Sequence, residues 1–158
     1  MPMWTPTIES NMTGCSSKMT EISAASPEYL DTLLRYYEDE IRGEAYFFAL
    51  AEHFEEREKM ILLGKVERRA AEAVVPLLQK YGLEPRDESI IHAEGNSHLW
   101  GHETYTWAEF LTHIVNRYPG YLDDFNGLEA MAPSEDLYAL KVLTEHEVAA
   151  IDFAKKNW

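Results

Sequence analysis

The chain has very little cysteine, few basic residues and no long apolar run, and each shortage excludes a class of protein. Its single cysteine, Cys15, excludes an intramolecular disulfide and a zinc cage built from cysteines. No apolar run approaches the ~20 residues that span a bilayer. Residues 1–25 also lack the basic and apolar regions of a secretory signal. We therefore expect a cytoplasmic protein without a membrane partner.

The shortage of basic residues gives the chain a strong negative charge. Only 14 Lys and Arg residues oppose 28 Asp and Glu residues, for a formal net charge of −14. Such a charge repels phosphate backbones and anionic lipid surfaces. The densest basic stretch, Lys65 with Arg68 and Arg69, itself lies among acids. Nucleic acid is therefore not an expected partner.

What the chain does have is helical periodicity. Residues 1–25 show no period and are expected to form a loosely ordered arm, whereas 26–158 fits one domain. Ser26 and Pro27 form a helix start, a serine N-cap followed by a first-turn proline. Two apolar stripes that are out of phase follow. They predict a helical hairpin over 27–81 with its turn in 55–59.

The second half of the chain predicts further helices. Residues 82–105 show no sustained period and are expected to form a long connection. Thr106 and Glu109 form a capping box that begins a helix, which Pro119-Gly120 is expected to break. A last helix is predicted over roughly 135–157. Together these segments predict an all-α, up-down four-helix bundle with one long crossover.

Three glutamates interrupt the apolar stripes. They are Glu44, Glu67 and Glu147, and an isolated ionised carboxylate in a core must be paired, protonated or bound to a metal. At ~1.5 Å of rise per residue, Glu44 and Glu67 differ in height by only about 5 Å. Glu147 falls opposite Tyr118, so the third helix offers no carboxylate at that level. The polar residues nearest to it on that helix are His113, Asn116, Tyr118, Tyr121 and Asp123.

Three segments carry a family resemblance. "DEIRGEAYFFALAEHF" (39–54), "KVERRAAEAVVPLLQKYGL" (65–83) and "LTEHEVAAIDFA" (143–154) are similar in layout to the first, second and fourth helices of the ferritin-like superfamily, which includes rubrerythrins and bacterioferritins. The resemblance implies a ferritin-like four-helix bundle that holds iron or manganese. By resemblance, Glu44 is the first-helix ligand, Glu67 the bridging second-helix ligand, and Glu147 or His146 the fourth-helix ligand.

The sequence departs from this family at two positions. Full di-iron members carry Glu-x-x-His, and here Ala70 and Ala150 stand at that spacing after Glu67 and Glu147. Three forms of the site therefore stay open. They are a mononuclear or weak metal site, a two-metal site that uses His146 and a tyrosine, and a metal-free network of carboxylates and tyrosines.

Other polar residues have simpler interpretations. Glu40, one turn before Glu44, is expected to be an exposed acid, with a second carboxylate of the site as the alternative, and His53 is expected to be a surface residue. His146 is expected at the edge of the core, hydrogen-bonded to a carboxylate or acting as a ligand. A further, weaker candidate metal cluster is found in the connection, with members His92, His98, His102, Glu94 and Glu103.

The function expected from these features is oxidative chemistry at an iron or manganese centre that uses O₂ or peroxide. The expected partners are the metal ion and an unidentified small molecule, with a homodimer as the candidate assembly. Two alternatives stay open. One is a catalytically silent ferritin-like bundle that serves as a binding scaffold. The other is a metal-free core pocket in which the glutamates hold a cationic or hydroxylated ligand.

Overall fold

The structure, a computed structural model, describes residues 25–158, so the expected N-terminal arm lies outside the described residues apart from Ala25. All regular elements in this range are helical, which confirms the all-α class. The elements are α3 (Pro27–Leu50), η1 (Ala51–His53), α4 (Arg57–Tyr81), α5 (Glu88–Ser97), η2 (His102–Thr104), α6 (Trp107–Met131), η3 (Ser134–Asp136) and α7 (Leu137–Lys156).

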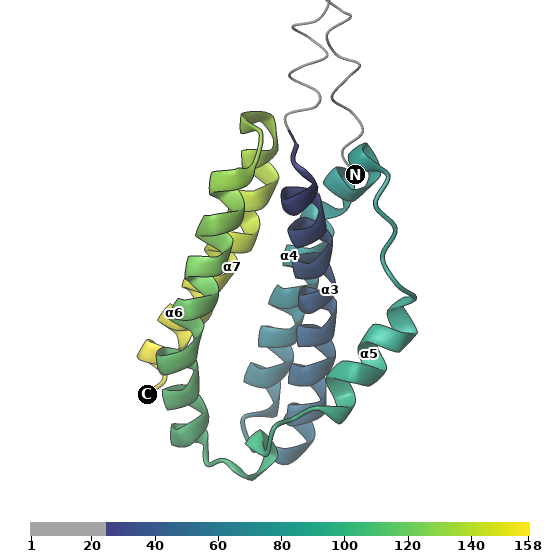
Figure 1. Cartoon of the computed structure of the whole chain (residues 1–158). Helices are drawn as coiled ribbons and strands as arrows, with labels where there is room; N and C mark the ends of the chain where they lie inside the picture. Colours follow the sequence, from purple (N-terminus) through teal and green to yellow (C-terminus); the bar gives the residue numbers. More distant parts are fainter. Residues whose placement is uncertain (1–24) are drawn as a thin grey trace, which may run out of the picture.

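The four long helices form two antiparallel hairpins. Figure 1 shows α3 with α4 in one hairpin and α6 with α7 in the other, with α5 on the flank of α3 that faces away from α6. The hairpins meet chiefly through α4 and α7, whereas α3 and α6 make few contacts. In the part of the chain described here, no helix has both the length and the apolar character needed to cross a membrane.

Several helix ends agree with the sequence-based expectations. The Ser26 side chain accepts a hydrogen bond from the Tyr29 amide, and Pro27 occupies the first turn of α3. Gly82 ends α4 in the left-handed region, at φ 64°, where a side chain would be strained. Thr106 and Glu109 form the expected reciprocal capping box at the start of α6. Local hydrogen bonding alone therefore determines these boundaries.

Two expectations about the second half were wrong. Pro119-Gly120 does not break the third helix, because α6 runs without interruption from Trp107 to Met131. Pro119 removes only one backbone hydrogen bond from the helix. Tyr118 and Phe125, on either side of Pro119-Gly120, are both buried, and this packing holds the two halves of α6 in one helix. The connection 82–105 also contains α5, whose weak signal is explained by its two buried residues, Ile91 and Gly95.

The apolar core consists of two large clusters. One cluster surrounds Phe47, Phe110 and Ile114, and the other surrounds Leu33 and Leu140. Between these clusters lies a layer in which α3, α4 and α7 contribute the ionisable side chains of Glu40, Glu67, His146 and Glu147. This layer across the bundle contains the candidate site.

Candidate functional site

Four ionisable side chains from three helices meet in the layer between the two apolar clusters. Glu40 comes from α3, Glu67 from α4, and the adjacent His146 and Glu147 from α7. Glu40, His146 and Glu147 are each no more than 6% exposed. Burying so many ionisable groups is costly unless they are paired with a counter-charge, protonated or bound to a metal.

Three carboxylate oxygens surround one nitrogen of this cluster. The Nε2 atom of His146 lies 2.8 Å from an oxygen of Glu40, 2.9 Å from one of Glu67 and 3.2 Å from one of Glu147. A single ring nitrogen carries at most one proton, so at most one hydrogen is shared among these three oxygens. The remaining lone pairs therefore face one another at close range.

The other nitrogen of the His146 ring fixes its orientation. Nδ1 contacts the backbone carbonyl oxygen of Leu143, which can only accept a hydrogen bond, so Nδ1 carries a proton. Nε2 then either carries a proton and donates to the carboxylates around it, or, in the neutral ring, offers a lone pair to a metal. Metal-binding histidines are commonly held in this way, with the second ring nitrogen donating to a backbone carbonyl.

The atoms of the cluster fit a bound cation. Glu40 Oε1 and His146 Nε2 are buried and satisfy each other only through their 2.8 Å contact, and the buried Glu147 Oε2 has no hydrogen-bond partner among the described residues. Ligands at right angles around an ion at ~2.1 Å lie about 3.0 Å apart, as the oxygens and Nε2 do here. Potential ligand atoms of Glu40, Glu67 and His146 all lie within 4.8 Å of one another. Nitrogen with carboxylate oxygen suits iron, manganese or zinc.

Protonation is the alternative way to neutralise the cluster. Burial raises the pKa of Glu40 well above its usual range, and the charge of Glu67 raises it further. Burial also raises the pKa of Glu147. Burial alone would lower the pKa of His146, but the negative charge of Glu40 and hydrogen bonds to the glutamates outweigh this effect and raise it. Without a metal, the cluster would therefore hold extra protons.

Gly43 makes room for Glu67 in the cluster. A Cβ atom at Gly43 would lie 2.3 Å from Glu67 Oε1, well inside van der Waals contact. The carboxylate of Glu67 therefore lies against the backbone of α3, in a space that any side chain would fill.

Glu44, one of the four predicted metal ligands, does not lie in this cluster, whereas Glu67, Glu147 and His146 do. Its carboxylate pairs with Arg68 at 2.8 Å and with His92 of α5 at 3.0 Å. The reason is α5, which covers a second side of α3 and gives that helix two buried faces. Glu44 belongs to the face toward α4 and α5, and Glu40 to the face toward the cavity.

Glu40 is the member of the cluster that the sequence analysis placed wrongly. It was expected to be exposed, and it is 4% exposed. A signal was available, because Tyr36, Gly43 and Phe47 continue a stripe through Glu40 at helical spacing. His53, by contrast, is exposed as expected.

The histidines of the connection do not form one cluster. His92 contacts Glu44, and Nδ1 of His98 donates a hydrogen bond to the backbone carbonyl oxygen of Glu94 in α5. His102 instead shares a 2.6 Å hydrogen bond with Tyr46, stacks on Tyr105 and lies against His113, at 4.3 Å between ring centroids. The predicted site with Glu94 and Glu103 is therefore not assembled, because Glu94 is bound by Arg42 and Arg86.

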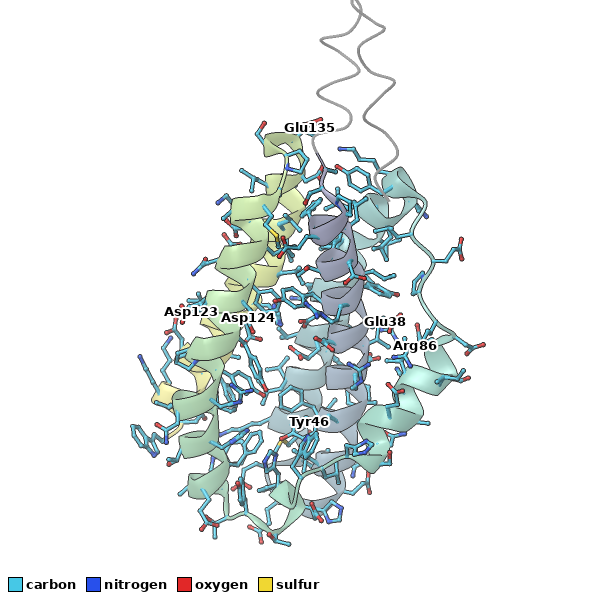
Figure 2. All side chains as sticks on the ribbon, in the orientation of Figure 1. Glu38, Tyr46, Arg86, Asp123, Asp124 and Glu135 are labelled. Carbon is cyan, nitrogen blue, oxygen red and sulfur yellow. The ribbon has the colours of Figure 1, made fainter. Side chains whose placement is uncertain are left out.

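A cavity of about 800 Å³ leads to the cluster. It lies between α3 and α6, and its lining includes Glu40, Glu67 and Glu147. Figure 2 labels two residues that line it, Tyr46 on α3 and Asp124 on α6. Among the predicted third-helix residues, the lining includes His113, Tyr118 and Tyr121, and it does not include Asn116 or Asp123.

Comparisons with known protein families, with curated proteins and with solved structures found no match to this chain.

Proposed function

We propose that the protein is a ferritin-like metal-binding protein, in which Glu40, Glu67, Glu147 and His146 hold iron or manganese for oxidative chemistry. The convergence of three carboxylate oxygens on His146 Nε2, in a buried layer with unsatisfied polar atoms, carries this proposal. The two hairpins and the long crossover between α4 and α6 support the ferritin-like part.

The proposed ligand on α3 lies one helical turn before the ligand that the family resemblance implies. Glu40 takes the place assigned to Glu44, and His146 and Glu147 both serve from α7. Bound iron or manganese would supply single-electron exchange with O₂ or peroxide. The protein itself orients His146 through the Leu143 carbonyl and encloses the reacting end of the cavity.

Residues next to the cluster are suited to hold protons. Tyr118 lines the cavity and is 8% exposed, and burial raises its pKa well above the usual range. Burial likewise raises the pKa of Tyr46, whose hydroxyl is bonded to His102. Both phenols therefore stay protonated at neutral pH. The Tyr118 hydroxyl can donate a hydrogen bond to a small molecule in the cavity, whereas the Tyr46 hydroxyl is already shared with His102.

Metal content tests the proposal. Protein purified without a polyhistidine tag and loaded with Fe(II) or Mn(II) under anaerobic conditions should retain stoichiometric metal after desalting, measured by elemental analysis. Exposure of the iron form to O₂ should then oxidise the iron, followed by absorbance. His146→Gln should lose most of the bound metal, because it removes the only nitrogen ligand.

Glu44→Gln is the matched control for this experiment. It removes a buried carboxylate from α3, one turn away from Glu40, and it leaves the cluster intact. It should therefore retain metal like the wild type. Absence of bound iron and manganese in the wild type would refute the metal assignment and favour the metal-free binding scaffold.

Gly43→Ala is expected to weaken metal binding without unfolding the protein. The added methyl group displaces the Glu67 carboxylate, while alanine in a helix interior is favoured over glycine by up to about 1 kcal/mol. Affinity should fall by about 10- to 100-fold, as for other changes that disorient a ligand. A competition titration against a chromophoric chelator measures this fall.

Gly127→Ala provides the comparison. A Cβ atom at Gly127 of α6 would have no other atom within 4 Å, so its affinity for metal should equal that of the wild type. Equal affinities in both variants would show that Glu67 is not a ligand.

A further inference from the structure

The cavity is larger and more aromatic than a metal centre alone requires. Its volume of about 800 Å³ falls within the usual range for small-molecule sites. Aromatic side chains form much of the wall between α3 and α6, and they include Tyr36, Tyr46, Tyr118, Tyr121 and Phe125. A planar apolar body would therefore find ring faces and edges on both sides.

One cation at this cavity lacks an acidic partner. Arg42 is neutralised by Asp39 and Glu94, whereas Arg117 makes no ion pair with any residue in the described range. The Arg117 guanidinium instead lies over the ring of Tyr121, 4.5 Å from its centroid. In a chain with twice as many acids as bases, an arginine left free beside a cavity is available for an anion.

The groups around Arg117 leave its charge available. Burial lowers the pKa of His113, and the charges of His102 and Arg117 lower it further. Burial lowers the pKa of His102 as well, so both rings are neutral at pH 7. Asp124 also lines the cavity, but it lies about 10 Å further along α6 by helical rise.

Trp100 gives the mouth of the cavity an exposed aromatic face. It lines the cavity, is 74% exposed, and adopts φ 59°, the left-handed region that bulky residues avoid. The indole packs against His98, 5.6 Å between ring centroids, and its exposed part offers a ring face to an aromatic ligand.

We propose that this cavity binds an aromatic carboxylate of one or two fused rings. The carboxylate pairs with Arg117, the ring packs among the aromatic side chains, and the far edge points toward Glu40, Glu67 and Glu147. Without a bound metal, the negative charge of the glutamate cluster disfavours the reverse orientation. The inference rests on the proposed function in that it names the substrate class of the same site.

Isothermal titration with 2-naphthoate and 2-naphthamide tests this inference. These probes have the same ring system and differ in charge. Wild-type protein should bind 2-naphthoate more tightly than 2-naphthamide, and Arg117→Gln should weaken 2-naphthoate binding by about tenfold while leaving 2-naphthamide unchanged. Arg57→Gln, which removes an exposed cation paired with Glu52, should bind both probes like the wild type.

A second variant separates stacking from charge. Trp100→Ala should weaken the binding of both probes, since it removes ring contact and no charge. Equal affinity of the two probes for the wild type, an Arg117→Gln variant that binds 2-naphthoate normally, or no binding of 2-naphthoate would each overturn the inference.

Titrations on chelator-treated and on metal-loaded protein keep the two proposals apart. Arg117-dependent binding of 2-naphthoate by a protein that retains no metal would support the ligand class and refute the metal centre. Retention of metal by a protein that does not bind 2-naphthoate would do the opposite.

Discussion

A saturating divalent ion is expected to raise the melting temperature of the wild-type protein by about 5–10 °C. An ion that binds only the folded state, at a hundred times its Kd, stabilises it by about 2.7 kcal/mol. For a domain of this size, one kcal/mol corresponds to roughly 2–4 °C. Thermal melts of chelator-treated protein with and without Fe(II), Mn(II) or Zn(II) measure the rise, with the iron samples kept anaerobic.

Variants of the proposed ligands should lose this metal-induced rise in melting temperature. Glu40→Gln and Glu67→Gln should lose most of the rise, because an amide is a far weaker metal ligand than a carboxylate. Without metal they should be as stable as the wild type or more stable, because each removes one of several buried negative charges around His146. Glu44→Gln should keep the full rise, since Glu44 pairs with Arg68 and His92 instead.

A metal-free network predicts different melts. No divalent ion would then shift the melting temperature, and truncation of Glu40 or Glu67 to Ala would lower stability by about 1–3 kcal/mol by leaving buried partners unsatisfied. That combination of results would contradict the metal assignment and leave the all-α fold unaffected.

Local signals in the sequence predicted most helices, because caps and apolar stripes act over a few residues. Ser26, Gly82 and the Thr106 capping box mark helix ends for reasons that involve only their neighbours. The helix α5 was not predicted, because it contains Gly95 and buries too few residues to show a helical period of apolar side chains. Gly95 is needed because a Cβ there would lie 2.3 Å from the Arg42 carbonyl oxygen.

Three of the four residues of the candidate site could be predicted from the sequence, whereas the choice of the fourth could not. Glu67, His146 and Glu147 occur where stripes are interrupted, and the structure brings them together. The choice between Glu40 and Glu44 depends on which side of α3 faces the cavity. That choice follows from α5, which adds a second buried face to α3 through Glu44, Arg68 and His92. The stripe through Tyr36, Glu40, Gly43 and Phe47 marks one of these buried faces, but periodicity alone does not say which face lines the cavity.

The ion-pair network around α5 is another feature that depends on tertiary packing and could not be predicted from the sequence pattern. Figure 2 shows Glu38 of α3 beside Arg86, whose Nε lies 2.9 Å from Glu38 Oε1. Arg86 also binds Glu94, which in turn binds Arg42. These residues are far apart in the sequence, and none interrupts an apolar stripe. Only the packing of α5 on α3 assigns them to one network.

Asp136, which the sequence analysis did not single out, is expected to contribute more to stability than any exposed acid. It is 1% exposed and joins three elements at one end of the bundle. The hydroxyls of Tyr29 and Tyr81 each donate to its Oδ2 at 2.7 Å, and Lys80 Nζ lies 2.7 Å from its Oδ1. Asp136→Asn should lower the unfolding free energy by about 2–4 kcal/mol.

The pH dependence of this loss identifies its cause. Burial acts to raise the pKa of Asp136, but its hydrogen bonds with Lys80, Tyr29 and Tyr81 outweigh burial and lower the pKa. A lowered pKa stabilises the folded state fully above the unfolded-state value of about 3.9, and this contribution disappears as the pH falls through the lower folded value. The gap between wild type and Asp136→Asn should therefore be constant near neutral pH and narrow below about pH 4.

Chemical denaturation across this pH range measures the gap, with Asp152→Asn as the comparison. Asp152 is an exposed acid on α7, so its replacement should change stability by no more than about 0.5 kcal/mol at any pH. If Asp136→Asn were as stable as Asp152→Asn, the bonds to Tyr29, Tyr81 and Lys80 would not be what holds this end of the bundle together. A loss of equal size at pH 3 and pH 7 would show that packing, and not the charge of Asp136, accounts for it.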